Sequence, residues 1–79
     1  MDLKYVRHSR IGFVLWPRTD DLWHSRVGEA LPRGGIASAG FASVEGGKVR
    51  CWGKSESLGI PSAPDDSKAL AQQLGLNAA

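Results

Sequence analysis

Two consecutive glycines, Gly46 and Gly47, place the tightest constraint on how this chain folds. They are preceded by Val-Glu and followed by Lys-Val. A Gly-Gly pair between such runs is typical of a β-hairpin, because both glycines tolerate the positive φ of a two-residue turn. We therefore predict a hairpin over residues 36–58, whose turn fixes the register of the pairs. Counting outward gives Val44 with Val49, Ala42 with Cys51, Gly40 with Gly53, Phe41 with Trp52 and Ser43 with Arg50.

The two faces of this predicted hairpin differ in kind, since side chains alternate between faces along a strand. One face carries small side chains, which let a helix approach closely, and we expect it to belong to the core. The other face carries Phe41 and Trp52 beside Arg50 and Lys54. The sequence leaves open whether a helix covers this aromatic pair or whether it stays accessible.

The segment from Leu3 to Trp16 is rich in β-branched and aromatic residues and stops at Pro17, which predicts a strand. Whether it is one strand or a hairpin that bends near Ser9–Arg10 remains open. From Ile11 onward both alternating faces are apolar, which predicts a strand covered on both sides. One face holds Ile11, Phe13 and Leu15, and the other holds Val14 and Trp16.

Helical spacing indicates two helices. The first is predicted from about Asp20 to Leu31, capped by Thr19 or Asp20 and ended by Pro32. Its periodic positions are Leu22, Trp23, Arg26, Val27, Ala30 and Leu31. The second follows a cap at Ser62 or Asp65, carries a stripe of Leu70, Ala71 and Leu74, and ends at Gly75, after which residues 77–79 are expected to fray.

The resulting element order, β-α-β-β-α, predicts an α+β fold. We expect a small antiparallel or mixed sheet of three to four strands with two helices. With 79 residues, the chain is expected to form a single domain over residues 1–79.

Cysteine usage and charge limit the cellular compartments and the partners that we expect for the protein. Cys51 is the only cysteine, so no internal disulfide can form, and this favours a reducing compartment. The charged N-terminal residues do not resemble a signal peptide, and no apolar run approaches the roughly 18 residues of a membrane span. We therefore expect a cytoplasmic protein without a membrane partner. The net charge of +2 is too small to imply a polyanionic partner by itself.

Motifs that carry chemistry are incomplete in this sequence. The run Trp52-Gly53-Lys54-Ser55 lacks the earlier glycine that a phosphate-binding loop needs. One cysteine and two separated histidines do not make a zinc site, and no nucleophile elbow is found. We predict no catalytic residue, no metal and no cofactor, hence a non-enzymatic protein. A small enzyme built around a reactive Cys51 is the third class considered.

Three tryptophans are more than a core of this size buries easily, so at least one is expected to be exposed. Our leading hypothesis is a non-enzymatic interaction module that acts through protein contacts as a homodimer, because exposed tryptophan and arginine are enriched at binding hot spots. The alternative is a nucleic-acid-binding module that stacks bases on Trp52 and Phe41. The candidate interaction surface comprises Trp52, Phe41, Arg50, Lys54, Trp23, Arg7 and Arg10.

Four short runs, Ser38–Phe41, Cys51–Gly59, Pro64–Ser67 and Gln73–Gly75, form a pattern in the second half of the chain. This pattern resembles that of short bacterial proteins with no assigned function. The resemblance implies a bacterial origin and attaches no activity or fold to the chain.

Overall fold

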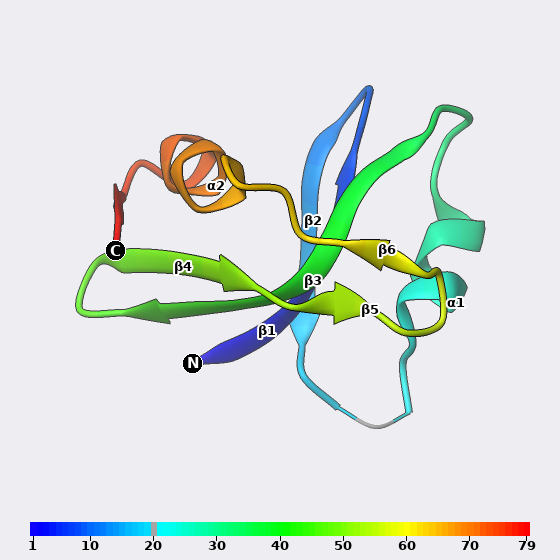
Figure 1. Ribbon diagram of the computed structural model, residues 1–79, viewed down its shortest axis with the longest axis horizontal. Helices are drawn as coiled ribbons and strands as arrows, with labels where there is room; N and C mark the ends of the chain where they lie inside the picture. The colour runs from blue at the N-terminus through cyan, green and yellow to red at the C-terminus, as the bar shows by residue number, and fades with distance from the viewer. Residues whose placement is uncertain (20) are drawn as a thin grey trace.

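The computed structural model describes residues 1–19 and 21–79 and has an α+β architecture (Figure 1). Within these residues, five strands form a mixed sheet in the order β2-β1-β3-β4-β7, and β5 pairs with β6 in a second, two-stranded sheet. The predicted class is confirmed, but the predicted three to four strands were too few. The elements are β1 (Asp2–His8), β2 (Gly12–Pro17), α1 (His24–Ala30), β3 (Ile36–Glu45), β4 (Lys48–Trp52), β5 (Lys54–Ser55), β6 (Ile60–Pro61), α2 (Asp66–Leu74) and β7 (Asn77–Ala78).

The N-terminal segment is a hairpin, which settles the alternative that the sequence left open. β1 and β2 are antiparallel, and β1 pairs on its other side with β3. Ile11 lies in the turn and is largely exposed, so it is not part of the strand as expected. The two faces of β2 are as predicted: Phe13 and Leu15 join one apolar cluster, and Val14 and Trp16 join another.

The hairpin of β3 and β4 has the predicted register, with Val44 opposite Val49 and Phe41 opposite Trp52. It ends at Trp52 and does not continue to residue 58. Gly53 has a φ of 77°, and this left-handed conformation redirects the chain into β5. The predicted pairing of Gly40 with Gly53 is therefore not formed within the ladder. Gly40 instead permits a close approach, since a Cβ there would lie 2.5 Å from the carbonyl oxygen of Trp52.

Helix α1 begins at His24, so the predicted start near residue 20 was wrong. Trp23 is the N-cap residue and has extended backbone angles. Lys4 Nζ donates to the carbonyl oxygens of Thr19 and Leu22 at 2.6 and 3.1 Å, and Trp16 Nε1 also donates to Leu22. These side chains occupy carbonyl oxygens that would accept backbone hydrogen bonds in a longer helix. The predicted cap at Thr19 is not formed, and Asp20 lies outside the described residues.

Helix α2 ends as predicted, with Gly75 in the left-handed conformation after the last turn, and Asp65 occupies the N-cap position, but its side chain makes no capping hydrogen bond. Leu70 and Ala71 are buried, whereas Leu74 is exposed. The expectation of frayed C-terminal residues was wrong. Residues 77–78 form β7, which runs parallel to β4, and Ala79 N–H donates to the carbonyl oxygen of Val49 at 2.8 Å.

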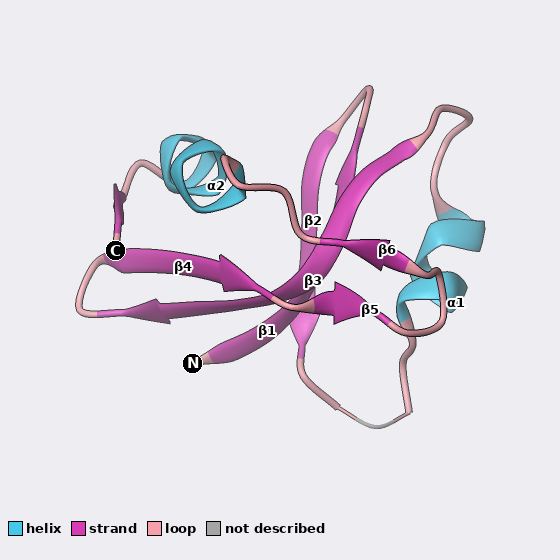
Figure 2. Cartoon of the chain, viewed as in Figure 1, coloured by secondary structure: helices cyan, strands magenta, loops and turns pink. Residues whose placement is uncertain are grey.

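The large sheet is covered on both faces, and each helix packs on a different one (Figure 2). The α2 face, so named here, holds the cluster of Tyr5, Phe13, Ala42, Val49, Leu70 and Ala71. The α1 face holds Val6, Trp16 and Ala39, against which α1 and the β5–β6 segment pack. α1 and the β5–β6 segment thus form a third layer over part of the α1 face.

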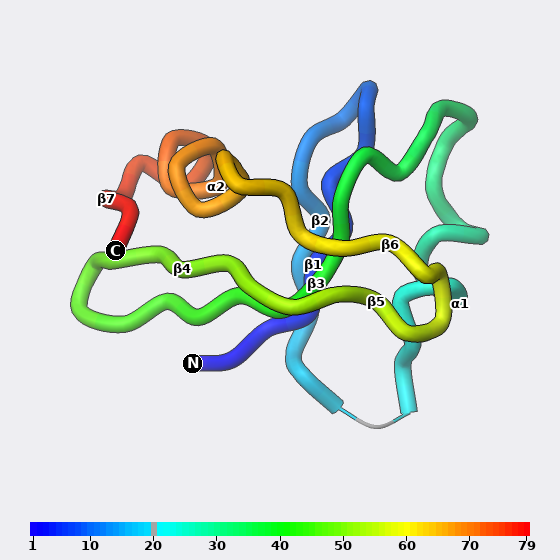
Figure 3. The backbone as a smooth tube through the Cα atoms, viewed as in Figure 1, coloured from blue at the N-terminus to red at the C-terminus, as the bar shows by residue number. Residues whose placement is uncertain are grey.

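The segment of α2 and β7 also covers both edges of the large sheet, as the chain trace illustrates for β4 (Figure 3). At β2, the Gln73 side chain accepts from Phe13 N–H and donates to Phe13 O. At β4, Ser67 Oγ accepts from Cys51 N–H, and β7 pairs with the rest of the strand. These bonds occupy Phe13 on β2 and much of the outer side of β4, whereas the outer side of β7 forms the edge of the sheet at that end. In the part of the chain that the structure describes, no helix has the length and apolar character needed to cross a membrane.

Candidate interaction surface

A row of large side chains crosses the α1 face of the sheet. The register places Lys4 between Trp16 on β2 and Phe41 on β3, and Phe41 lies opposite Trp52 on β4. His24, the first residue of α1, inserts its ring into this row. Its centroid lies 5.3 Å from that of Trp16 and 5.9 Å from that of Phe41, both edge to face, and Phe41 lies 6.2 Å from Trp52. The rings therefore form one continuous aromatic series.

Two arginines lie over the last two rings of this series, Phe41 and Trp52. The guanidinium carbon of Arg18 is 4.2 Å from the centroid of Phe41, and that of Arg50 is 5.4 Å from the centroid of Trp52. Both distances are typical of cation–π contacts. Arg18 also lies 3.9 Å from the carboxylate of Asp2. The guanidinium groups thus cover ring surface and hold positive charge at a fixed place.

A pocket of about 370 Å³ opens beside Phe41. Trp23 is 59% exposed although it lines this pocket. Four segments that are separate in sequence build the pocket: β1, the start of α1, β3, and the turn between β5 and β6. Its lining residues are Lys4, Trp23, His24, Phe41, Glu56 and Ser57.

The polar groups that line the pocket are engaged in bonds within the protein. Lys4 holds the carbonyls of the segment before α1, and His24 Nε2 lies 2.9 Å from the carbonyl oxygen of Gly40. Ser57 Oγ accepts from the N–H of Ser25. Burial lowers the pKa of His24, which the bond to Gly40 offsets only in part, so the ring is neutral at pH 7. What the pocket presents to a ligand is therefore mainly aromatic surface, with the Glu56 carboxylate at its edge.

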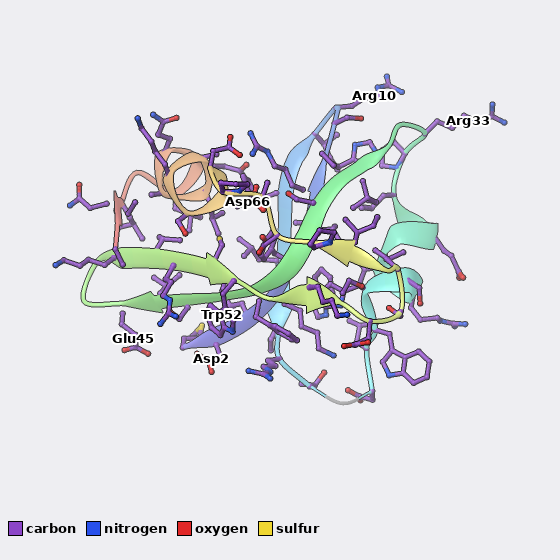
Figure 4. The ribbon with its side chains drawn as sticks, viewed as in Figure 1. Asp2, Arg10, Arg33, Glu45, Trp52 and Asp66 are labelled. Atoms are coloured by element: carbon purple, nitrogen blue, oxygen red, sulfur yellow. The ribbon has the colours of Figure 1, made fainter. Side chains whose placement is uncertain are left out.

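The structure gathers part of the predicted surface and disperses the rest. Phe41, Trp52, Arg50 and Trp23 share the α1 face, and Lys54 on β5 lies 4.0 Å from Glu56 at the pocket. Two predicted members lie elsewhere, so their inclusion was wrong. Arg7 is on the α2 face, bonded to Asp65 and Asp66, because it alternates with Lys4 and Val6 along β1. Arg10 is at the tip of the β1–β2 hairpin and donates to Arg33 O, far from Trp52 (Figure 4).

Sequence reasoning missed four members of this surface: Lys4, Arg18, His24 and Glu56. Lys4 and Arg18 reach it only because β1 lies between β2 and β3, a topology that no local pattern indicates. His24 was considered in the sequence as a zinc ligand, whereas the structure buries it at the start of α1, where it is 4% exposed. The pairing of the N-terminal hairpin with β3, had it been known, would have placed Lys4 beside Phe41.

A second polar cluster on the α2 face was also missed. Asp66 is fully buried and accepts from Tyr5 Oη at 2.5 Å, Ser38 Oγ at 3.0 Å and Arg7 Nη1 at 3.0 Å. The N–H of Ala63 donates to it at 2.9 Å. Burial by itself raises the pKa of Asp66, but these hydrogen bonds outweigh burial and lower the pKa below its usual range. This cluster joins α2 to β1 and β3, so its role is structural.

Cys51 is placed for packing. It belongs to the small-residue face of β4, packs against the cluster on the α2 face, and lies on the side of the sheet opposite His24. Burial, with the nearby Asp66 charge, raises the pKa of its thiol to about 11, so the thiol is protonated at pH 7. Among the described residues, no group of three histidine, cysteine or acidic side chains is placed to hold a metal ion.

No protein-family model, curated protein or solved structure matches the chain. The functional argument therefore rests on the geometry of the α1 face.

Proposed function

We propose that the protein is a non-enzymatic interaction module that binds protein partners through the pocket on its α1 face. The observation that carries the proposal is this pocket, which is walled by the exposed Trp23 and by the Phe41 and His24 rings. Tryptophan beside a pocket is typical of residues that dominate binding energy at protein interfaces. Because the polar lining is already engaged, the favoured occupant is an aromatic or aliphatic side chain.

Charge around the pocket defines what should accompany that side chain. Arg18 and Arg50 hold positive charge beside the rings, and Lys54 lies next to the pocket. A partner segment with carboxylates next to its apolar anchor complements this arrangement. The lone cysteine supports a location in a reducing compartment such as the cytoplasm.

Nucleic-acid binding is less well supported by the same geometry. Stacking of a base requires a free ring face, and Arg18 already lies over the ring of Phe41 at 4.2 Å while Arg50 lies over Trp52. Arg7 and Arg10, two basic members of the predicted surface, lie away from it. The net charge of +2 offers few phosphate contacts.

Selection from a random peptide library displayed on phage tests the proposal. Wild-type protein should enrich peptides that carry an aromatic or aliphatic residue beside Asp or Glu. Binding of these peptides, measured by calorimetry, should be lost in Trp23→Ala and retained in Ile11→Ala, which truncates another exposed apolar side chain at the distant hairpin turn.

Two outcomes contradict the proposal. The first is a selection in which none of the enriched peptides depends on Trp23 for binding. The other is tight, salt-sensitive binding of single-stranded oligonucleotides that disappears when Arg50 and Lys54 are neutralised, which would establish the nucleic-acid alternative.

A further inference from the structure

We propose that a second copy of this chain occupies the pocket, in a two-fold symmetric dimer in which Trp23 of each copy enters the pocket of the other. This inference rests on the proposed role of the pocket as a protein-binding site and names its partner. Three features of the structure support it: the covered sheet edges, the position of Trp23, and the distribution of charge around the pocket.

The contacts at the sheet edges favour association of two copies through a face of the sheet. Gln73 bonds both backbone groups of Phe13 on β2, and Pro17 at the end of that strand has no N–H to donate. β7 and Ser67 cover β4 on the other side. These contacts block strand pairing between two copies at Phe13 and along much of β4. The α2 helix covers the α2 face, whereas the pocket lies open on the α1 face.

Trp23 has the position that a reciprocal contact requires. In a two-fold interface the same patch on both copies must supply both the inserted group and the cavity that receives it. Trp23 is 59% exposed and lines the pocket, and its neighbour Leu22 is 39% exposed. A pocket of about 370 Å³ accommodates a single indole side chain. Rotation about an axis beside Trp23 would place each indole over the Phe41 pocket of the other copy.

This face carries charges of both signs, and within one copy Glu56 lies 4.0 Å from Lys54 and Arg18 lies 3.9 Å from Asp2. Arg18 and Arg50 lie over the Phe41 and Trp52 rings. Glu56 is at the pocket beside Trp23, and Asp21 precedes Trp23 by two residues in an exposed segment. A two-fold axis brings the basic part of one copy against the acidic part of the other. Such an arrangement favours one register of the dimer and disfavours others.

Sedimentation equilibrium over a range of protein concentrations tests the proposal. Wild-type protein should show a reversible monomer–dimer equilibrium. Trp23→Ala should raise the dimer Kd by roughly thirtyfold or more, as expected for an aromatic hot spot. Ile11→Ala is the matched control, since it removes an exposed apolar side chain away from this face, and it should leave the Kd unchanged. Circular dichroism of each variant verifies that it is folded.

A charge exchange gives a second, independent readout. Arg50→Glu and Glu56→Lys should each weaken self-association, because each places like charges across the axis. A mixture of the two variants should form a heterodimer more readily than either forms a homodimer. Failure of the mixture to associate, with both variants folded, would contradict the charge arrangement.

The outcomes separate this inference from the proposed function. A monomer at every concentration, or a dimer that persists unchanged in Trp23→Ala, overturns the exchanged-tryptophan dimer. Trp23-dependent peptides from the phage selection would then still support a pocket that binds another protein. Loss of both results removes both proposals.

Discussion

The two faces of the large sheet use their polar and aromatic groups in opposite ways. On the α2 face, the Asp66 carboxylate is fully buried and receives four donors, and the surrounding cluster is closed by Leu70 and Ala71. On the α1 face, two guanidinium groups lie over rings that remain partly accessible, and the largest exposed side chain, Trp23, lines a pocket. The first arrangement holds an element in place, and the second leaves contact surface available.

This difference shows how a small domain can use one face of its sheet for stability and the other face for binding. A buried carboxylate is favourable only when its donors are all present, so the Asp66 cluster ties α2 to two strands at once. On the α1 face, Trp23 is 59% exposed. We therefore expect substitutions on the α2 face to change the free energy of unfolding, and substitutions at the pocket to change binding.

The largest expected effect is that of Asp66→Ala. This variant leaves the Tyr5 and Ser38 hydroxyls and the Arg7 guanidinium without their shared acceptor, and removal of one partner from a buried charged cluster costs about 3–5 kcal/mol. Urea unfolding measures the loss. The neighbouring Asp65→Ala is the control, since that exposed carboxylate makes a surface ion pair with Arg7 and should cost less than about 1 kcal/mol. Equal losses in both variants would refute the distinction.

Acid should weaken the α2 face through the same residue. The pKa of Asp66 is lower in the folded protein than the value of about 3.9 expected when the chain is unfolded. Its contribution to stability is therefore complete above about pH 4 and is lost as the pH falls through the lower pKa of the folded state. Urea midpoints measured from pH 6 down to about pH 2 should fall more steeply for the wild type than for Asp66→Asn. Parallel curves would show that Asp66 does not titrate as described.

The substitution Gly40→Ala, which adds a methyl group on β3, should disturb the end of β4. Its Cβ would lie 2.5 Å from the carbonyl oxygen of Trp52, so the end of β4 must shift, at a cost of about 1–3 kcal/mol. Gly28→Ala in α1 is the control with the opposite sign, because a Cβ there meets nothing within 4 Å. It should stabilise the protein by up to about 1 kcal/mol. Thermal unfolding of the two variants measures both effects. A Gly40→Ala variant as stable as the wild type would disprove the close approach.

The smallest expected effect on stability is that of Trp23→Ala. The side chain is mostly exposed, and truncation should change the free energy of unfolding by no more than about 0.5 kcal/mol. Leu70→Ala on the α2 face, which truncates a fully buried side chain, should cost about 2–5 kcal/mol by comparison. Denaturant unfolding of both variants under monomeric conditions measures the contrast. A large loss in Trp23→Ala would mean that the pocket is part of the core.

Local signals in the sequence predicted those parts of the fold that depend on neighbouring residues. The Gly46-Gly47 turn determined the register of β3 with β4, and the Gly75 stop determined the end of α2. The start of α1 was mispredicted, because its competing bonds come from Lys4 and Trp16 on other elements. The same reason explains the unexpected pairing of β7 with β4.

The candidate surface was predicted in part for the same physical reason. Phe41, Trp52 and Arg50 share a face of one hairpin, and their proximity follows from its register. Arg7 and Arg10 were grouped with them by charge alone, and the alternation along β1 and the position of the turn place them elsewhere. Asp66 was not singled out from the sequence, because its side-chain partners lie on β1 and β3.

The cover that α2 and β7 place over both edges of the large sheet has a consequence for how the chain folds. Gln73 contacts Phe13 and Asp66 contacts Tyr5, so the last part of the chain completes structure that begins near the first residues. Such long-range contacts close large loops and slow folding. Until residues 66–79 have been synthesised, the sheet would expose β2 and β4 to other nascent chains. Residues 66–79 thus determine when β2 and β4 gain these contacts during synthesis, and slowing translation before this segment should increase aggregation.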